Sequence, residues 1–205
     1  ALISKRLLQP QVEIKFITDP INSVYGGIQS EQYRKLRQHG IDVIETNLIP
    51  LRASNPSWSG FWYLCCQGIG NNPEKGWLPN PFGPEKITLR SYFDLFNFKA
   101  NHRKTLVVDT DQGWKALVTS MNPHDGSSRH SNIGLLVWGT TAVDILRTEQ
   151  SVGIMSQANM PAIIAGDFQA ENTQPQVQVL TEKAIYDATL NLIQTAKENE
   201  QIDLA

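Results

Sequence analysis

The sequence predicts an α/β fold with a mixed, mostly parallel sheet flanked by helices. Three observations lead to this expectation. Of the 205 residues, 40% are hydrophobic and 19% are charged, which is the balance of a globular domain. A strand-helix-strand pattern fills about 35 residues near the start of the chain, as in a unit that pairs two parallel strands. The run IGLLVW (133–138) is almost wholly apolar, which predicts a strand buried on both faces.

The first strand-helix-strand unit is marked out by its boundary residues. Alternating apolar residues predict a strand over 11–18, and Asp19-Pro20 ends it because proline cannot continue a ladder. Ser30 is suited to cap a helix over 31–39, which ends before Gly40. The segment IDVIET (41–46) then predicts the parallel partner strand.

Residues 50–86 differ in composition from the preceding segment, because they are rich in proline, glycine and aromatic residues. A segment this long without clear periodicity is typical of a functional loop, and its aromatic content favours an ordered one. Its Trp and Tyr side chains either contact lipid or substrate, or pack the loop onto the domain. The adjacent Cys65 and Cys66 have poor spacing for a structural disulfide, so we expect ordinary buried thiols.

The second half of the chain predicts a hairpin and two helices. The strands of the hairpin are expected at 104–109 and 114–121, around an Asp-Gln-Gly turn. A helix is expected to begin at Thr140 or Thr141, and another to cover 181–197. Apolar residues of the latter recur at helical spacing, which predicts a stripe that packs against the core or against another lobe.

The organisation predicted for the chain is one lobe over 1–165, a linker over 166–175 and the beginning of a second repeat over 176–205. The first residues read as the last part of a helix, and EQIDLA (200–205) reads as a strand cut short. We therefore expect an excerpt of a longer chain, truncated at both ends.

The charge of the chain limits the classes of binding partner that we expect. The formal net charge is −2, so no global basic field indicates nucleic-acid binding. The window 99–130 is nonetheless slightly basic within an otherwise acidic chain, which suits an anionic headgroup. No apolar run approaches the ~20 residues that span a bilayer. We expect a soluble fragment, and whether the parent chain is cytoplasmic or peripheral to a membrane is left open.

The residues with the clearest chemistry lie between 101 and 122. His102 and Lys104 are two residues apart, so on one strand they point to the same side. An imidazole beside an ammonium combines a nucleophile with a clamp for an anion. Asp109 follows at a fixed interval, and the next hairpin strand ends with Ser120 and Asn122, whose hydroxyl and amide add neutral donors for phosphoryl oxygens.

This arrangement resembles the phospholipase D superfamily, whose hallmark is H-x-K-x4-D with a following G-S-x-N. The His-Lys-Asp spacing is complete, whereas Thr119 stands in the place of the glycine and the interval after Asp109 is a few residues longer. The resemblance covers most of the chain and implies a phospholipase D-like lobe. Such enzymes have two lobes that each give one motif to a shared site, and this chain carries one motif. A second lobe or a second copy of the chain is therefore an expected partner.

The resemblance also implies roles for the residues. His102 is either the nucleophile that forms a phosphohistidine or the acid that protonates the leaving alcohol, and both assignments stay open. Lys104 and Asn122, with Ser120, are expected to hold the phosphate oxygens, and Asp109 to support a histidine. No metal or cofactor is implied, because lysine and histidine supply the electrostatic stabilisation.

The expected activity is hydrolysis of a phospholipid phosphodiester, or phosphatidyl transfer of the cardiolipin-synthase kind. The aromatic segment and the mild acidity favour a lipid headgroup over nucleic acid, and peripheral membrane contact is a further expectation. Two alternatives remain: a nuclease of the same superfamily, and a degenerate lobe that only binds.

Overall fold

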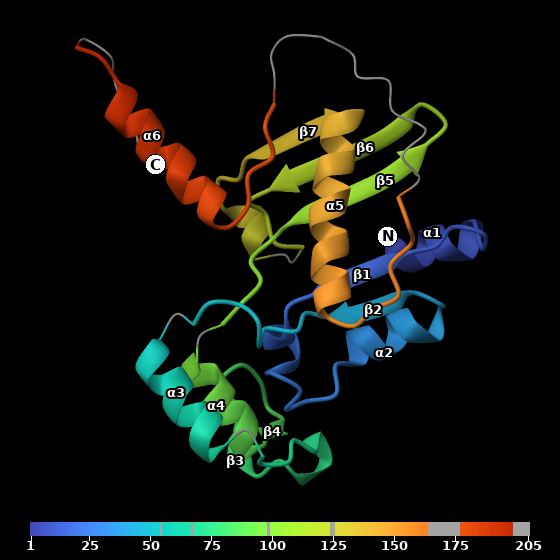
Figure 1. Cartoon of the computed structure of the whole chain (residues 1–205). Helices are drawn as coiled ribbons and strands as arrows, with labels where there is room; N and C mark the ends of the chain where they lie inside the picture. The colour runs from blue at the N-terminus through green and yellow to red at the C-terminus, as the bar shows by residue number, and fades with distance from the viewer. Residues whose placement is uncertain (54, 67, 98, 124–125, 164–176, 199–205) are drawn as a thin grey trace. The chain divides into compact units, whose positions relative to one another are not determined.

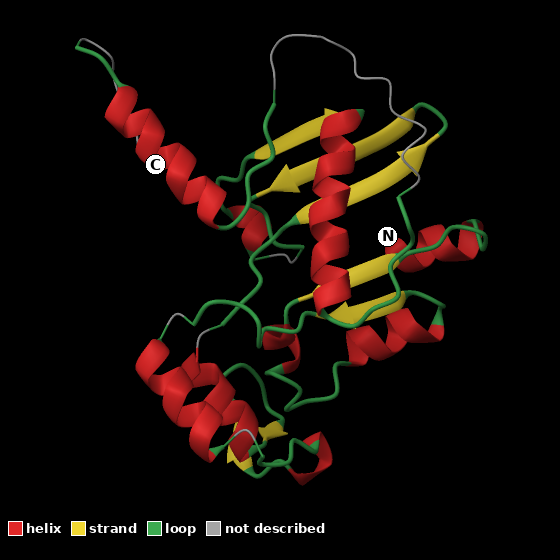
Figure 2. Ribbon diagram, viewed as in Figure 1, coloured by secondary structure: helices red, strands yellow, loops and turns green. Residues whose placement is uncertain are grey.

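The chain is mixed α/β, as predicted. The computed structural model describes residues 1–53, 55–66, 68–97, 99–123, 126–163 and 177–198 (Figure 1). The described residues form six α-helices, three short 3-10 helices and seven strands (Figure 2). They divide into two compact units: unit 1 comprises 1–103 and 151–161, and unit 2 comprises 104–150 and 162–205.

Unit 1 contains the predicted strand-helix-strand arrangement. Strands β1 (Lys15–Thr18) and β2 (Asp42–Glu45) pair in parallel, and α2 (Glu31–Gln38) connects them. The Ser30 hydroxyl accepts a hydrogen bond from the backbone N–H of Tyr33, so the predicted N-cap is confirmed. Gly40 follows α2 with a φ of +70°, a backbone conformation that favours glycine. The parallel pair is confirmed, although β1 is shorter than the predicted strand 11–18.

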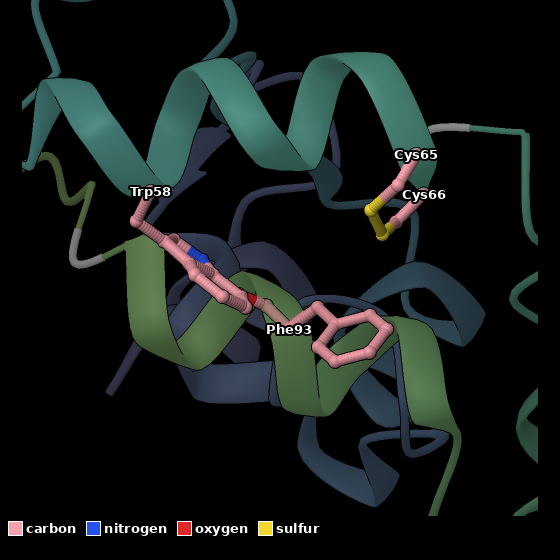
Figure 3. Close-up of a disulfide and its surroundings, with 4 residues drawn as sticks. All are labelled: Trp58, Cys65, Cys66 and Phe93. Atoms are coloured by element: carbon pink, nitrogen blue, oxygen red, sulfur yellow. A yellow bond between two sulfur atoms is a disulfide. The ribbon is translucent and has the colours of Figure 1, made fainter.

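The aromatic segment of unit 1 differs from the predicted loop, because it contains helix α3 (Pro56–Cys65). Asn55 caps this helix by accepting a hydrogen bond from the backbone N–H of Trp58 at 3.2 Å, and Pro56 occupies its first turn. The Trp58 ring lies 5.8 Å from the ring of Phe93 on helix α4 (Leu89–Asn97) (Figure 3). The large apolar side chains of α3 lie on both its buried and its exposed sides: Trp62 is buried, while Phe61 and Leu64 are exposed. The sequence of α3 therefore shows no single apolar stripe at helical spacing.

The remaining elements of unit 1 are short. They are helix α1 (Leu2–Leu8), the 3-10 helices η1 (Pro20–Ser23) and η2 (Pro73–Lys75), and the antiparallel strands β3 (Leu78–Pro79) and β4 (Lys86–Ile87).

The prediction of free thiols at Cys65 and Cys66 is wrong, because the structure joins the two side chains in a disulfide (Figure 3). The two Cα atoms are 3.7 Å apart, as the peptide bond between them requires. The bond lies at the carboxyl end of α3, where Cys66 is buried and Cys65 is exposed.

Unit 2 is built on an antiparallel sheet with the order β5-β6-β7. Its strands are β5 (Thr105–Thr110), β6 (Gly113–Thr119) and β7 (Gly134–Trp138). The pairing of β5 with β6 confirms the predicted hairpin. Helix α5 (Thr140–Met155) begins at the predicted threonine, and its first turns cover one face of the sheet (Figure 1). Ala116, Val137, Ala142 and Ile145 form the buried core between sheet and helix.

Two expectations about the sheets are wrong. Most described strand pairs are antiparallel, because these pairs are joined without an α-helix and only β1-β2 has an α-helical crossover. Strand β7 was expected to be buried on both faces, but only its Val137 is buried, while Leu136 and Trp138 are 57% and 65% exposed.

The C-terminal part of unit 2 contains helix α6 (Lys183–Thr195), close to the predicted span of 181–197. None of its residues is buried, so the structure does not pack its apolar stripe into a core. The predicted linker 166–175 and the predicted terminal strand 200–205 lie outside the described residues. Over the part of the chain that is described, no helix has the length and apolar character to cross a membrane.

Candidate phosphodiesterase site

The backbone immediately before His102 is anchored by buried polar groups of unit 1. The Asn101 backbone N–H donates to a carboxylate oxygen of Asp19. The Asn101 side-chain amide donates to the Thr46 hydroxyl at 3.1 Å. Asp19 and Thr46 are buried, at 8% and 2% exposure, so these bonds are shielded from water.

These two anchors occupy equivalent places in the fold. Asp19 directly follows β1 and Thr46 directly follows β2, so both lie at the carboxyl ends of parallel strands. That edge of a parallel sheet is where α/β proteins place their ligand sites. The anchoring of Asn101 therefore fixes the chain, one residue before an exposed His102, at the edge where a reactive side chain is expected.

Lys104 lies at the beginning of the sheet of unit 2. Its carbonyl oxygen accepts a hydrogen bond from the backbone N–H of Thr119 at 2.9 Å, which extends the β5-β6 ladder by one pair. Directly opposite residues share a face of a sheet, so Lys104 lies on the same face as Thr119. Thr119 stands where the resemblance expects glycine, and it is followed at once by Ser120.

Ser120 is held by hydrogen bonds to the segment that leads into β7. Its hydroxyl accepts from the backbone N–H of Ile133 at 3.0 Å and lies 3.2 Å from the side-chain oxygen of Asn132. Its backbone N–H donates to the Ile133 carbonyl at 2.9 Å. In this state the Ser120 hydroxyl braces the end of the sheet, and its predicted contact with phosphate stays a prediction.

Asn122 lies on a connection fixed by a buried serine. The Asn122 backbone N–H donates to the Ser127 hydroxyl at 2.9 Å, and the side-chain amide of Asn132 donates to the Ser127 carbonyl at 2.7 Å. Ser127 is only 6% exposed, so it holds both segments of the connection. The exposed side-chain amide of Asn122 makes no hydrogen bond with the described residues, which leaves its donors available to a ligand.

The structure does not bring Asp109 beside Lys104. Five residues separate them along β5, or about 17 Å at the rise of an extended strand. An odd separation also turns the two side chains to opposite faces of the sheet. Asp109 pairs with Trp114 next to the hairpin turn and is exposed. Its predicted role beside a histidine stays a prediction.

The described residues contain no cluster of three or more His, Cys, Asp or Glu side chains that could hold a metal ion. The groups with site chemistry are instead a histidine, a lysine, a hydroxyl and an amide, which are donors and a nucleophile for an anionic substrate.

Comparison with known proteins adds no relative: no protein-family model, no curated protein and no solved structure matches this chain.

Sequence reasoning missed the anchoring role of Asp19 and Thr46. Both residues were read only as the ends of strands. The signal was present, because polar residues that directly follow two parallel strands meet at one edge of a sheet.

Proposed function

We propose that this chain contributes one histidine-lysine motif to a phosphodiester-cleaving or phosphatidyl-transferring site of the phospholipase D kind. The observation that carries the proposal is the anchoring of Asn101 by Asp19 and Thr46, because it fixes the chain next to His102 at a strand-end edge. The ladder contact of Lys104 with Thr119 supports it, since it puts a cation one residue away from Ser120 and near the chain that leads to Asn122.

The chemistry has two steps. The imidazole of one histidine attacks phosphorus, so a P–N bond forms as the P–O bond to the leaving alcohol breaks. A histidine from the second motif donates its proton to that leaving oxygen. Water or an alcohol then attacks phosphorus, gives its proton to the second histidine and breaks the P–N bond. Lys104 and Asn122 hold the non-bridging oxygens, where negative charge concentrates.

The substrate class we propose is a phospholipid. Unit 1 exposes large apolar side chains in its aromatic segment: Phe61, Leu64, Trp77 and Phe82 are each more than half exposed. Aromatic side chains of this kind favour the headgroup zone of a membrane. The formal net charge of −2 argues against a general attraction to nucleic acid.

The test is hydrolysis of bis(4-nitrophenyl) phosphate by the chain over a dilution series. Because one chain carries one motif, we expect activity per molecule to rise with concentration as two copies complete one site. His102→Ala is expected to abolish turnover. His39→Ala is the matched control, because His39 lies half-buried at the end of α2 and its ring contacts the Lys35 carbonyl of the same helix.

Turnover that persists in His102→Ala contradicts the proposal. Silence together with tight binding of phospholipid vesicles favours the degenerate, binding lobe. Cleavage of DNA, with binding that weakens steeply as salt is raised, favours the nuclease.

A further inference from the structure

Unit 1 contains a pocket of about 270 Å³ that the candidate site does not use. Its walls come from the ends of β1 and β2 and from helices α3 and α4. The side chains that matter to its chemistry are Trp62, Tyr63, Arg90, Asp94, Asn97 and Lys99. All of them belong to unit 1, so the pocket is a property of that unit alone.

Lys99 is a buried cation in this pocket, with 6% exposure. Its ammonium donates to the carbonyl of Ile49 at 3.1 Å and to the hydroxyl of Tyr63 at 3.2 Å, and it lies 5.6 Å from the centre of the Tyr63 ring. These partners are all neutral, and no Asp or Glu of the described chain forms an ion pair with Lys99. An ammonium has three donors, so one remains unused. A buried charge is normally paired, so a buried ammonium with only neutral partners indicates a site for an anion.

Trp62 supplies a second unused donor. Its side chain is 3% exposed, and within the described part of the chain its indole N–H has no hydrogen-bond partner. Buried polar groups are hydrogen-bonded in the great majority of cases, so an orphan donor in the wall of a pocket indicates an acceptor that arrives with a ligand.

Each of the two carboxylates that line the pocket pairs with an arginine. Glu45 accepts from the Ser23 hydroxyl at 2.7 Å and lies 3.5 Å from the guanidinium of Arg37. Asp94 lies 3.9 Å from the guanidinium of Arg90 on the same helix. Neither carboxylate pairs with Lys99.

We propose that this pocket is a binding site for a phosphate monoester, held by the ammonium of Lys99 and the indole N–H of Trp62. A phosphate monoester has nearly two negative charges at neutral pH and three acceptor oxygens. Its three oxygens offer acceptors to Lys99, Trp62 and the amide of Asn97, which line the same pocket, whereas a carboxylate carries only one negative charge. The ligand is either a free small phosphate or the headgroup of a lipid, and both present the same group.

This assignment does not depend on the proposed function, because the pocket shares only Thr46, which anchors Asn101, with the candidate phosphodiesterase site, and neither Lys99 nor Trp62 belongs to that site. The experiment is therefore a binding measurement without turnover. Isothermal titration with glycerol 3-phosphate is expected to give saturable binding to the wild-type chain, and glycerol is expected to give none.

Two substitutions test the donors. Lys99→Met keeps the volume and removes the charge, and it is expected to weaken binding at least 10-fold. Trp62→Phe keeps a ring and removes the N–H, and we expect a loss of about 3- to 10-fold. Lys75→Met is the matched control, because Lys75 is exposed in unit 1 and does not line the pocket, and its affinity should equal that of the wild type.

Sedimentation with vesicles that contain phosphatidic acid distinguishes the sources. Co-sedimentation that is lost in Lys99→Met assigns the pocket to a lipid headgroup, and titration with the free phosphate alone assigns it to a soluble ligand. The proposal is overturned if the wild-type chain binds neither probe, or if Lys99→Met, with the far-UV circular dichroism of the wild type, binds as tightly as the wild type.

Discussion

The two units differ in how they hold the groups that the two proposals use. Unit 1 buries polar side chains in hydrogen bonds, with Asp19 and Thr46 holding the chain before His102 and Lys99 lying in a pocket. The sheet of unit 2 is covered by α5 on one face, while Leu136 and Trp138 are exposed on the other.

The contrast shows how the histidine and the lysine of one short motif are held differently. The chain at His102 is fixed by buried bonds to side chains, whose loss leaves unsatisfied groups. The chain at Lys104 is fixed by a strand ladder, which does not depend on any one side chain. Substitution of the residues that anchor the chain before His102 should therefore change stability, whereas substitution of Lys104 is expected to change activity more than stability.

Among the substitutions that compare the two units, the largest effect is expected from Lys104→Met. If Lys104 holds a phosphate oxygen, its loss should lower kcat/KM by about 10²- to 10³-fold, as removal of one electrostatic donor does. Lys115→Met is the control, because Lys115 lies on the same face of the same sheet and contacts Gln112. Equal activities of the two variants on bis(4-nitrophenyl) phosphate would remove Lys104 from the site.

Asp19→Ala should destabilise the fold by about 2–3 kcal/mol, since it leaves the backbone N–H groups of Ile21 and Asn101 without their charged acceptor. Asp42→Ala is the control. Asp42 is exposed and pairs with Lys15 at 3.2 Å, a surface ion pair that contributes about 0–1 kcal/mol. Urea unfolding measures both, and a loss as small for Asp19 as for Asp42 would mean that the anchor is not structural.

Asp94 makes the stability of unit 1 depend on pH. Burial, the largest influence, raises its pKa from 3.8 to about 6, against the opposing charge of Arg90. Between about pH 4 and pH 6 the Asp94 carboxyl thus keeps a proton in the folded chain that it has lost in the unfolded chain. The free energy of unfolding therefore falls as the pH rises through this range.

Asp94→Asn should remove this dependence and stabilise the chain at pH 7.5 by about 1–2 kcal/mol, with a smaller gain at pH 5. Urea unfolding at the two pH values measures it, with the exposed Asp144→Asn as control. An identical response of the Asp94 variant and the wild type to pH would contradict the assignment.

The smallest effects compare the two faces of the sheet in unit 2. Val137→Ala removes methyl groups from the core under α5 and should cost about 1–2 kcal/mol. Leu136→Ala, one residue earlier on the exposed face, should change stability by less than about 0.5 kcal/mol. Similar losses at both positions in urea unfolding would show that the Leu136 face is covered in solution.

The sequence was informative where local rules decide the structure. The β1-α2-β2 unit, the β5-β6 hairpin and the start of α5 follow from caps, turns and alternation, and all are confirmed. Helix α3 was missed because its aromatic side chains point both into unit 1 and outward, which hides the helical period.

The candidate site, like the fold, could be predicted from the sequence only in part. The pairing of Lys104 with Thr119 is predictable from the sequence, because the two residues belong to one hairpin and hairpin pairing is local. The anchors Asp19 and Thr46, and the pocket around Lys99, join residues more than 30 positions apart in the chain. Pairings of that kind depend on tertiary packing, which residue spacing does not encode.

The most direct test of the central claim is rapid quenching of the reaction with bis(4-nitrophenyl) phosphate, followed by mass spectrometry of the chain. The account predicts a 4-nitrophenylphosphoryl group on His102 in the wild type, at up to one per pair of chains, and none in His102→Ala. Turnover without any phosphorylation of His102 would contradict it.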